Sequence, residues 1–181
     1  ASTPSPAEPA DPRIARVLRE AGWILLAAAG AYLALALASF HPEDPGPFHS
    51  RTSEALRNRA GGLGAWIAEA LLTVFGLSAW WWVALLLWGV VRLYGRVEDW
   101  ESVDRRSLAV SLTGFAVLLV SSSALEAMRF HTHTVPLPQP PGGLLGLLAE
   151  APARAALGFT GATLVLIALV AAAFSLFTGL S

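Results

Sequence analysis

The chain has 181 residues, of which 55% are hydrophobic, and a formal net charge of −1. A single water-soluble core of this size has no room for so many apolar side chains, so the composition indicates a membrane protein. The absence of cysteine excludes disulfides and thiolate metal sites, and the mixed charges argue against a nucleic-acid-binding surface.

The amino-terminal region combines a polar tail with a long apolar run. Residues 1–12 are rich in Ala, Ser and Pro and are predicted to be disordered, because they cannot bury enough apolar area to offset the entropy of ordering. Residues 21–40 then contain no ionisable group, and a helix of this length crosses about 30 Å of hydrocarbon. Ala36-Leu37-Ala38 resembles a signal cleavage site, but the run exceeds the usual signal core of about 7–15 residues. We therefore predict an uncleaved span.

The next apolar region, 61–94, is too long for one straight span, because a helix of this length would extend about 51 Å. Two arrangements fit: two spans that meet at 76–78, or an interfacial helix over 63–75 followed by one span over 77–95. We prefer the second arrangement. The interfacial helix is expected to lie at, or dip into, the outer surface of the membrane.

Three consecutive tryptophans follow the predicted break. Trp80, Trp81 and Trp82 support an interfacial position, since indole rings concentrate at headgroup depth. A buried structural role for these three residues is the alternative. Glu69 falls within the interfacial helix, and it faces either a partner helix or water.

Two further apolar runs, 107–128 and 158–180, complete a set of four predicted spans. Every proline lies outside these spans, as expected from the cost of proline inside a helix. The runs lack the alternation of strands, and a lipid-exposed backbone must pair within its own helix. The predicted fold is all-α, with a four-span membrane domain over 13–181 and short interfacial helices in the outer loops.

The third span contains the polar residues nearest the membrane interior. Ser121, Ser122 and Ser123 have no histidine or lysine at membrane depth to activate them, so we predict that they bond to carbonyls one turn earlier or contact another helix. Glu126 lies three residues before Arg129, a helical spacing that favours an ion pair at the water boundary.

Arginine positions indicate the orientation, because cytoplasmic loops are enriched in positive charge. Four spans with the amino terminus inside place seven arginines inside and five outside, and an inverted five-span arrangement gives the same ratio. The arginines over 92–106 lie close to two span ends and carry more weight than the others. Both termini are therefore predicted to be cytoplasmic.

No pattern in the chain indicates catalysis or a cofactor. The chain has no nucleophile elbow, phosphate-binding loop or zinc-hydrolase motif. His131 and His133 form a weak candidate metal pair without a third ligand nearby, and a pH-sensitive loop is an equally weak alternative. Small residues repeat instead at helical spacing on two spans, which favours close helix packing within the chain or between copies: Gly30, Ala34 and Ala38, and Ala168 and Ala172.

Four segments, taken in their order along the chain, resemble a known family. They are SFHPEDPG at 39–46, AGGLGAWIAEALLTVFG at 60–76, PGGLLGLL at 141–148 and LGFTGATLVLIALVAAAFSLFTGLS at 157–181. In order and spacing they resemble the amino-terminal four-span membrane domain of the FtsK/SpoIIIE DNA translocases, over about residues 13–181.

The resemblance implies a module of the bacterial inner membrane. It would anchor a cytoplasmic, hexameric, ATP-driven DNA pump at the division septum and contact other septal membrane proteins. The family's Walker motifs and DNA reader are absent from these residues, so we interpret the chain as a membrane fragment that needs no cofactor, is not an enzyme and does not touch nucleic acid.

The resemblance also marks particular residues. Asp44 and Pro45 match the family's outer turn, in which an acid bonds its own backbone. The other matches are glycines at the start of the second element and before the fourth span, where side chains would block the backbone, together with one tryptophan: Gly61, Gly62, Gly64, Trp66, Gly142, Gly143 and Gly146. Each residue serves either local turn geometry or partner contact.

A small transporter or channel subunit is the alternative function. It should show buried charged groups or broken-helix binding groups at mid-depth, and in this sequence only Glu69, near an edge, comes close. An intramembrane hydrolase is a third possibility, but it lacks an activated nucleophile.

Overall fold

The computed structural model describes residues 12–48, 56–95, 105–130 and 137–179. Within these ranges the chain forms helices and loops and no strand, which confirms the predicted all-α class. The elements are α1 (Pro12–Ala38), α2 (Gly61–Phe75), the short 3₁₀ helix η1 (Gly76–Ala79), α3 (Trp80–Gly95), α4 (Arg105–Arg129) and α5 (Gly143–Thr178).

The described residues contain four helical segments that are long and apolar enough to cross a membrane: Glu20–Ala38, Gly61–Arg92, Arg106–Arg129 and Gly143–Thr178. Two of these segments, Gly61–Arg92 and Gly143–Thr178, are longer than the roughly 17–25 residues that one crossing needs. Both change direction along their length, at η1 and at Gly158. The predicted disorder of 1–12 concerns residues that, apart from Pro12 at the start of α1, lie outside the described ranges.

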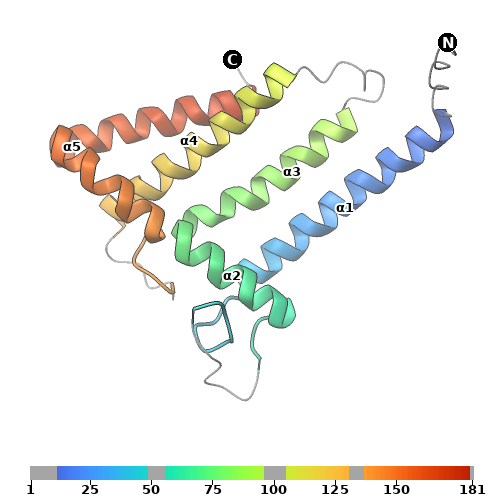
Figure 1. Cartoon of the computed structure of the whole chain (residues 1–181), viewed down its shortest axis with the longest axis horizontal. Helices are drawn as coiled ribbons and strands as arrows, with labels where there is room; N and C mark the ends of the chain where they lie inside the picture. The colour runs from blue at the N-terminus through green and yellow to red at the C-terminus, as the bar shows by residue number, and fades with distance from the viewer. Residues whose placement is uncertain (1–11, 49–55, 96–104, 131–136, 180–181) are drawn as a thin grey trace, which may run out of the picture.

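The helices form two packed pairs (Figure 1). Helices α1 and α3 run antiparallel, and they approach closely where Gly30 of α1 meets Leu86 of α3 and where Gly89 of α3 meets Leu26 of α1. The predicted small-residue face of α1 thus packs within the chain. Helix α4 packs against α5, and a Cβ at Gly114 would lie 2.7 Å from the backbone nitrogen of Phe177. In both pairs a glycine permits close approach of two helices.

A cluster of aromatic side chains joins the two pairs. The ring of Trp82 lies edge-on to Phe115, with 5.2 Å between centroids, and the rings of Phe115 and Phe177 are 5.4 Å apart. Trp81 lies against Phe174, and Trp80 is 41% exposed. Trp81 and Trp82 thus pack between helices, which fits the alternative of a structural role, and the interfacial depth of the three tryptophans stays a prediction.

The chain turns sharply at the break between α2 and α3. Gly76 has φ 60° and ψ −142°, and its N–H donates to the carbonyl of Leu72 at the end of α2. A residue with a side chain rarely adopts this left-handed region, so glycine allows the turn. Helix α2 consequently leaves the direction of α3 and runs across the ends of α1 and α3 (Figure 1).

Helix α5 contains a second change of direction, at Gly158. This residue has φ 66° and ψ 175°, a conformation essentially restricted to glycine. The first half of α5 (143–157) runs across α4, whereas the second half (159–178) returns along it (Figure 1). The first half of α5 lies before the predicted fourth span of 158–180, and it is helical from Gly143 onward.

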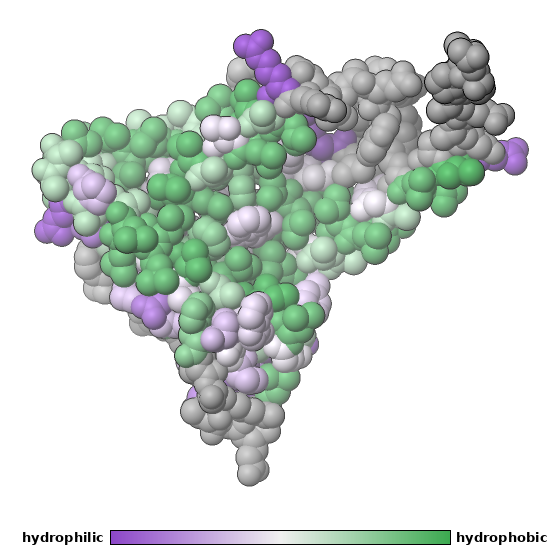
Figure 2. Space-filling view, viewed as in Figure 1, coloured by the Kyte–Doolittle hydropathy of each residue, from purple (hydrophilic) through white to green (hydrophobic). Residues whose placement is uncertain are grey.

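The bundle has two distinct ends (Figure 1). One end consists of the last turns of α1 and α4, of α2 and η1, and of the start of α5, and we call it the loop end. At the other end, α1 and α4 begin and α3 and α5 end, and we call it the termini end. Hydrophobic residues cover most of the face between them, and hydrophilic residues gather at its margins (Figure 2). This distribution is that of a protein surrounded by lipid.

Candidate functional site at the loop end

Asp44 holds the loop that follows α1. It is 3% exposed, and its carboxylate accepts hydrogen bonds from the backbone N–H groups of Arg57 and Asn58, both at 2.8 Å. The preceding residues form a turn in which the Asp44 N–H donates to the His41 carbonyl. The predicted acid that bonds backbone is therefore present, but its partners lie thirteen and fourteen residues away rather than within its own turn.

Asn58 links the same loop to the end of α1. It is 4% exposed, and its side-chain nitrogen donates to the Ala36 carbonyl at 2.9 Å. Its side-chain oxygen accepts from the N–H of Ala60, one residue before α2. One amide thus satisfies an orphan carbonyl at the end of α1 and an N–H before α2, which fixes the junction of the two helices.

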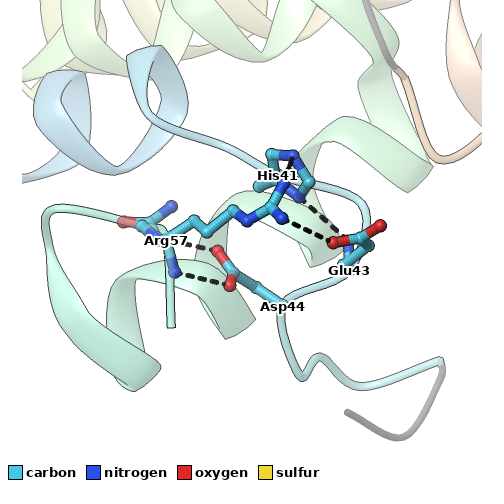
Figure 3. Close-up of polar contacts among 5 residues, drawn as sticks. His41, Glu43, Asp44 and Arg57 are labelled. Atoms are coloured by element: carbon cyan, nitrogen blue, oxygen red, sulfur yellow. Dashed lines mark hydrogen bonds and ion pairs between the residues drawn. The ribbon is translucent and has the colours of Figure 1, made fainter. Parts of the chain in front are cut away.

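An exposed ion pair covers this arrangement (Figure 3). The Arg57 guanidinium donates from Nη1 to Nε2 of His41 at 2.7 Å and pairs through Nη2 with Glu43 at 3.2 Å. The side chains of Arg57 and Glu43 are 53% and 50% exposed. A half-exposed pair contributes roughly 0–1 kcal/mol, so the stability of the loop depends on Asp44 and not on this pair.

Replacing Asp44 with alanine is expected to destabilise the loop end. The buried N–H of Asn58 and the partly buried N–H of Arg57 would lose their acceptor, and the loss of a buried one costs about 1–3 kcal/mol. Glu43→Gln is the matched control, with an expected change within about 0.5 kcal/mol. Limited proteolysis in detergent should show faster cleavage of the Asp44→Ala variant between α1 and α2. Equal cleavage rates for the two variants would contradict this role of Asp44.

Glu69 faces the protein. It is 2% exposed on α2, and a Cβ at Gly46 would overlap its carboxylate. The loop after α1 therefore lies directly on Glu69, so the side chain is not in water, and the group that covers it here is a loop and not a partner helix. The glycine at 46 is needed because any side chain there would displace the carboxylate.

Glu126 caps the break between α2 and α3. It is 3% exposed, and its carboxylate accepts from the N–H of Leu77 at 2.9 Å, the N–H of Ser78 at 3.1 Å and the Ser78 hydroxyl at 3.2 Å. These N–H groups belong to η1, at the start of the α3 segment, and are among those that lack partners in the helix itself. A carboxylate at this end is also favoured by the helix dipole.

The predicted ion pair between Glu126 and Arg129 is wrong. The Arg129 guanidinium lies 4.7 Å from the centre of the Phe159 ring, at the start of the second half of α5. Helical spacing allowed the pair, but the carboxylate of Glu126 is directed at η1, where it accepts hydrogen bonds from two backbone N–H groups and one hydroxyl.

Four glycines let three backbone segments meet beside Glu126. A Cβ at Gly143 would lie 2.7 Å from the Gly76 nitrogen and from the Thr73 carbonyl oxygen. Cβ atoms at Gly142 and Gly146 would overlap the Ser123 carbonyl oxygen of α4. Gly142 and Gly143 also have positive φ values, 81° and 59°. Gly142, Gly143 and Gly146 thus serve close backbone approach, and Gly146 lies inside α5.

The serines of α4 have structural partners, as predicted. Ser121 donates to the Val117 carbonyl one turn earlier, at 2.7 Å, and Ser122 donates to the Leu119 carbonyl at 3.3 Å. Ser123 donates across to the Phe75 carbonyl at the end of α2, at 3.3 Å. Their hydroxyl protons are therefore used in helix contacts.

The other candidate residues from the sequence lie at the start of α2 or outside the described residues. Gly61 has φ 77° at the start of α2, Gly62 faces open space, and Gly64 packs on Ala60, Asn58 and Ala36. Trp66 is 51% exposed. His131 and His133 lie outside the described residues, and the described residues contain no group of three or more side chains suited to a metal ion.

Sequence reasoning missed Asn58 and the role of Glu126. Both act on backbone groups distant in the chain, and such partners leave no local spacing pattern. An acid inside an otherwise apolar helix was the only available signal for Glu126.

The comparisons with known proteins agree on one family. A family model described as the 4TM region of DNA translocase FtsK/SpoIIIE matches residues 15–181. Similar curated proteins include DNA translocase FtsK 2 of Ralstonia nicotianae, which is 42% identical over 170 residues. DNA translocase FtsK of Shewanella oneidensis is 32% identical over 164 residues, and that of Vibrio vulnificus is 34% identical over 167 residues.

These alignments cover 91% of this chain but only 22%, 18% and 16% of the three relatives, respectively. The chain thus spans about a fifth of the length of the curated relatives that it matches. No solved structure gives a significant match.

Proposed function

Because this chain belongs to the FtsK/SpoIIIE family and corresponds to the 4TM region of a DNA translocase, we propose that it is the membrane anchor of a septal DNA pump and a docking module for cell-division proteins. In this proposal the chain couples chromosome segregation to division by holding the motor at the septum of the inner membrane. The relatives' names carry the translocase part of the proposal.

The arrangement of the helix ends is the observation that most supports an anchor. Helix α1 begins and α5 ends at the same end of the bundle (Figure 1). Residues that follow α5 would therefore emerge on the side from which α1 starts. A motor attached after α5 would share that side with the amino terminus, and we propose that this side is the cytoplasm.

The described arginines support this orientation. Arg13, Arg92 and Arg106 lie in the first or last turns of helices at the termini end. Arg96 directly follows α3 in the sequence and adds to the count. A concentration of arginine close to span ends is typical of a cytoplasmic face.

We propose that the chain acts without catalysis, and that ATP and DNA are handled by parts of the relatives beyond the region that it matches. The buried carboxylates support an anchor over a transporter. Asp44 and Glu126 direct their oxygens at backbone N–H groups of this chain. A transporter would need such groups to be open to a solute.

We further propose that the loop end contacts other septal membrane proteins and that copies of the chain associate through helix faces. Ala168 and Ala172 are exposed on the second half of α5, and small residues at this spacing allow close contact between helices. The hexameric state expected of the family's motor would bring such faces together.

Localisation of a fluorescent fusion tests the septal role. A fluorescent protein fused after Ser181 should concentrate at the division site of Ralstonia nicotianae, relative to a lipid dye in the same cells. An even distribution around the cell, matching the dye, would contradict septal docking while leaving the membrane assignment intact.

Chemical labelling tests the orientation. The chain has no native cysteine, so single cysteines at Leu56 and Gln139 of the loop end can be compared with one at Ser102. An impermeant maleimide applied to intact spheroplasts should label the first two positions and spare the third. Strong labelling at Ser102 would contradict a cytoplasmic termini end. Ser78 is a poor position because it is 7% exposed and bonded to Glu126.

A further inference from the structure

Helix α2 is attached to the bundle at both of its ends. Near its start, a Cβ at Gly64 would lie 3.4 Å from the Ala36 Cβ in the last turns of α1, and the Tyr32 hydroxyl of α1 donates to the Ala60 carbonyl just before α2. Just past its end, Leu77 and Ser78 are bonded to Glu126 in the last turn of α4. Both attachments lie where spans end, so α2 lies flat across the bundle and does not cross it.

The face of α2 that points away from the bundle is entirely apolar. Leu63 is 66% exposed and Trp66 is 51% exposed. The same face continues, at helical spacing, through residues that are half-buried: Ile67, Ala70 and Val74. The polar residues of α2 lie elsewhere, since Glu69 and Thr73 are both buried and the loop residue Gly46 lies on Glu69.

The first half of α5 repeats this arrangement on the other helix pair. Its start meets α4 at the Ser123 carbonyl, through Gly142 and Gly146. Just after its end, the Phe159 ring lies under Arg129, the last residue of α4. This half-helix is therefore also held crosswise at the last turns of α4.

Its outward face is apolar as well. Leu144, Leu147 and Leu148 are 44%, 40% and 75% exposed. The charged residues of this half-helix pair with each other, because Arg154 donates to Glu150 at 3.2 Å, one turn apart. Glu150 and Arg154 lie three and seven residues after Leu147, so the ion pair borders the strip formed by Leu144 and Leu148. An apolar strip beside a charged one makes this half-helix amphipathic in the way that interfacial helices are.

We propose that α2 and the first half of α5 form a lipid-binding platform at the loop end, with both helices in the plane of the bilayer and their exposed leucines and Trp66 in the boundary between headgroups and acyl chains. Lipid is the occupant because the platform is continuous with membrane-length helices and its exposed residues are mainly leucine and tryptophan, while the charged residues of the first half of α5 pair with each other. Tryptophan and leucine on such a face are typical of helices at this depth. The platform requires only that the chain is a membrane protein and is independent of the septal role.

Site-directed spin labelling tests the platform directly. Because the chain has no cysteine, a nitroxide can be attached at one position at a time in vesicles of phosphatidylethanolamine and phosphatidylglycerol. The test positions are Leu63 and Leu148. Leu87, 51% exposed on α3, is the control within a span, and the exposed loop residue Gln139 is the control in water. Collision rates with oxygen and with a water-soluble nickel chelate then report the depth of each label.

The expected result is an intermediate depth at both test positions. Leu63 and Leu148 should favour oxygen over the nickel chelate, but less strongly than Leu87 does. Nickel accessibility equal to that at Gln139 would overturn the platform and show a face free for a protein partner. A depth equal to that at Leu87 would also overturn it, because α2 or the first half of α5 would then enter the hydrocarbon. Septal localisation of the fluorescent fusion does not depend on any of these outcomes.

Discussion

Replacing Glu126 with alanine is expected to lower the free energy of unfolding by about 2–6 kcal/mol, because one buried and one partly buried N–H group lose their acceptor at a cost of about 1–3 kcal/mol each. Those N–H groups belong to Leu77 and Ser78, and the Ser78 hydroxyl loses its acceptor as well. No neighbouring group can replace the carboxylate without movement of α4, since Glu126 is 3% exposed.

Titration with sodium dodecyl sulfate in mixed micelles, followed by circular dichroism, measures this loss. Two matched variants separate the causes. Glu126→Gln keeps the shape and one carbonyl acceptor, so it should lose less stability than alanine. Glu150→Gln alters an acid whose only described partner is the exposed Arg154, and it should change stability by less than about 0.5 kcal/mol. If Glu126→Ala unfolds at the same fraction of sodium dodecyl sulfate as the wild type, the carboxylate does not stabilise the break between α2 and α3.

Replacing Gly143 with alanine is expected to have an effect at least as large. The new Cβ would lie 2.7 Å from the Gly76 nitrogen and the Thr73 carbonyl oxygen, both of which are backbone atoms that cannot rotate away. The positive φ of 59° adds strain for a residue with a side chain. Strain of this kind costs about 1–3 kcal/mol, and overpacking costs about 1–3 kcal/mol more.

The glycines of α2 supply controls that isolate each cause. Gly61 has φ 77° and open space around its Cβ position, so Gly61→Ala should show the cost of strain alone. Gly62 has neither a positive φ nor a close neighbour, so Gly62→Ala should be neutral or slightly stabilising, because alanine favours helix. The expected order of stability is therefore Gly62→Ala, then Gly61→Ala, then Gly143→Ala. Equal stability of the last two would show that the backbone crossing at Gly143 is loose.

Together these variants probe one joint of the protein. The break after α2, the last turns of α4 and the start of α5 meet within the reach of one carboxylate and four glycines. A fault there would tilt both crosswise helices at once. Loss of the proposed platform and of docking at the loop end should therefore accompany the loss of stability.

The helices themselves could be predicted from the sequence. Long apolar runs free of proline form helices in lipid, because a single segment can satisfy all of its backbone hydrogen bonds there only as a helix. The break near 76–78 was also predicted, since its glycine lies in a run too long for one crossing. The hydrogen bonds of Ser121 and Ser122 were predictable for the same reason, because each hydroxyl donates to a backbone carbonyl within one turn of its own helix.

The functional details were harder to predict, because they depend on residues distant in the chain. The sequence predicted an interfacial position for Trp81 and Trp82 but not their partners, the rings of Phe174 and Phe115 in the other helix pair. Asn58 gave no signal, since an asparagine in a loop is common and its partner is the Ala36 carbonyl.

What the sequence by itself determined is which segments are apolar helices, where glycine allows the chain to turn, and the family to which the chain belongs. Only the tertiary structure decided the direction of each turn and the partner of each buried acid. The physical reason is that helix formation in lipid is a local property of the backbone, whereas the bonds of Asp44 and Glu126 depend on N–H groups brought to them from elsewhere by the packing of the whole bundle.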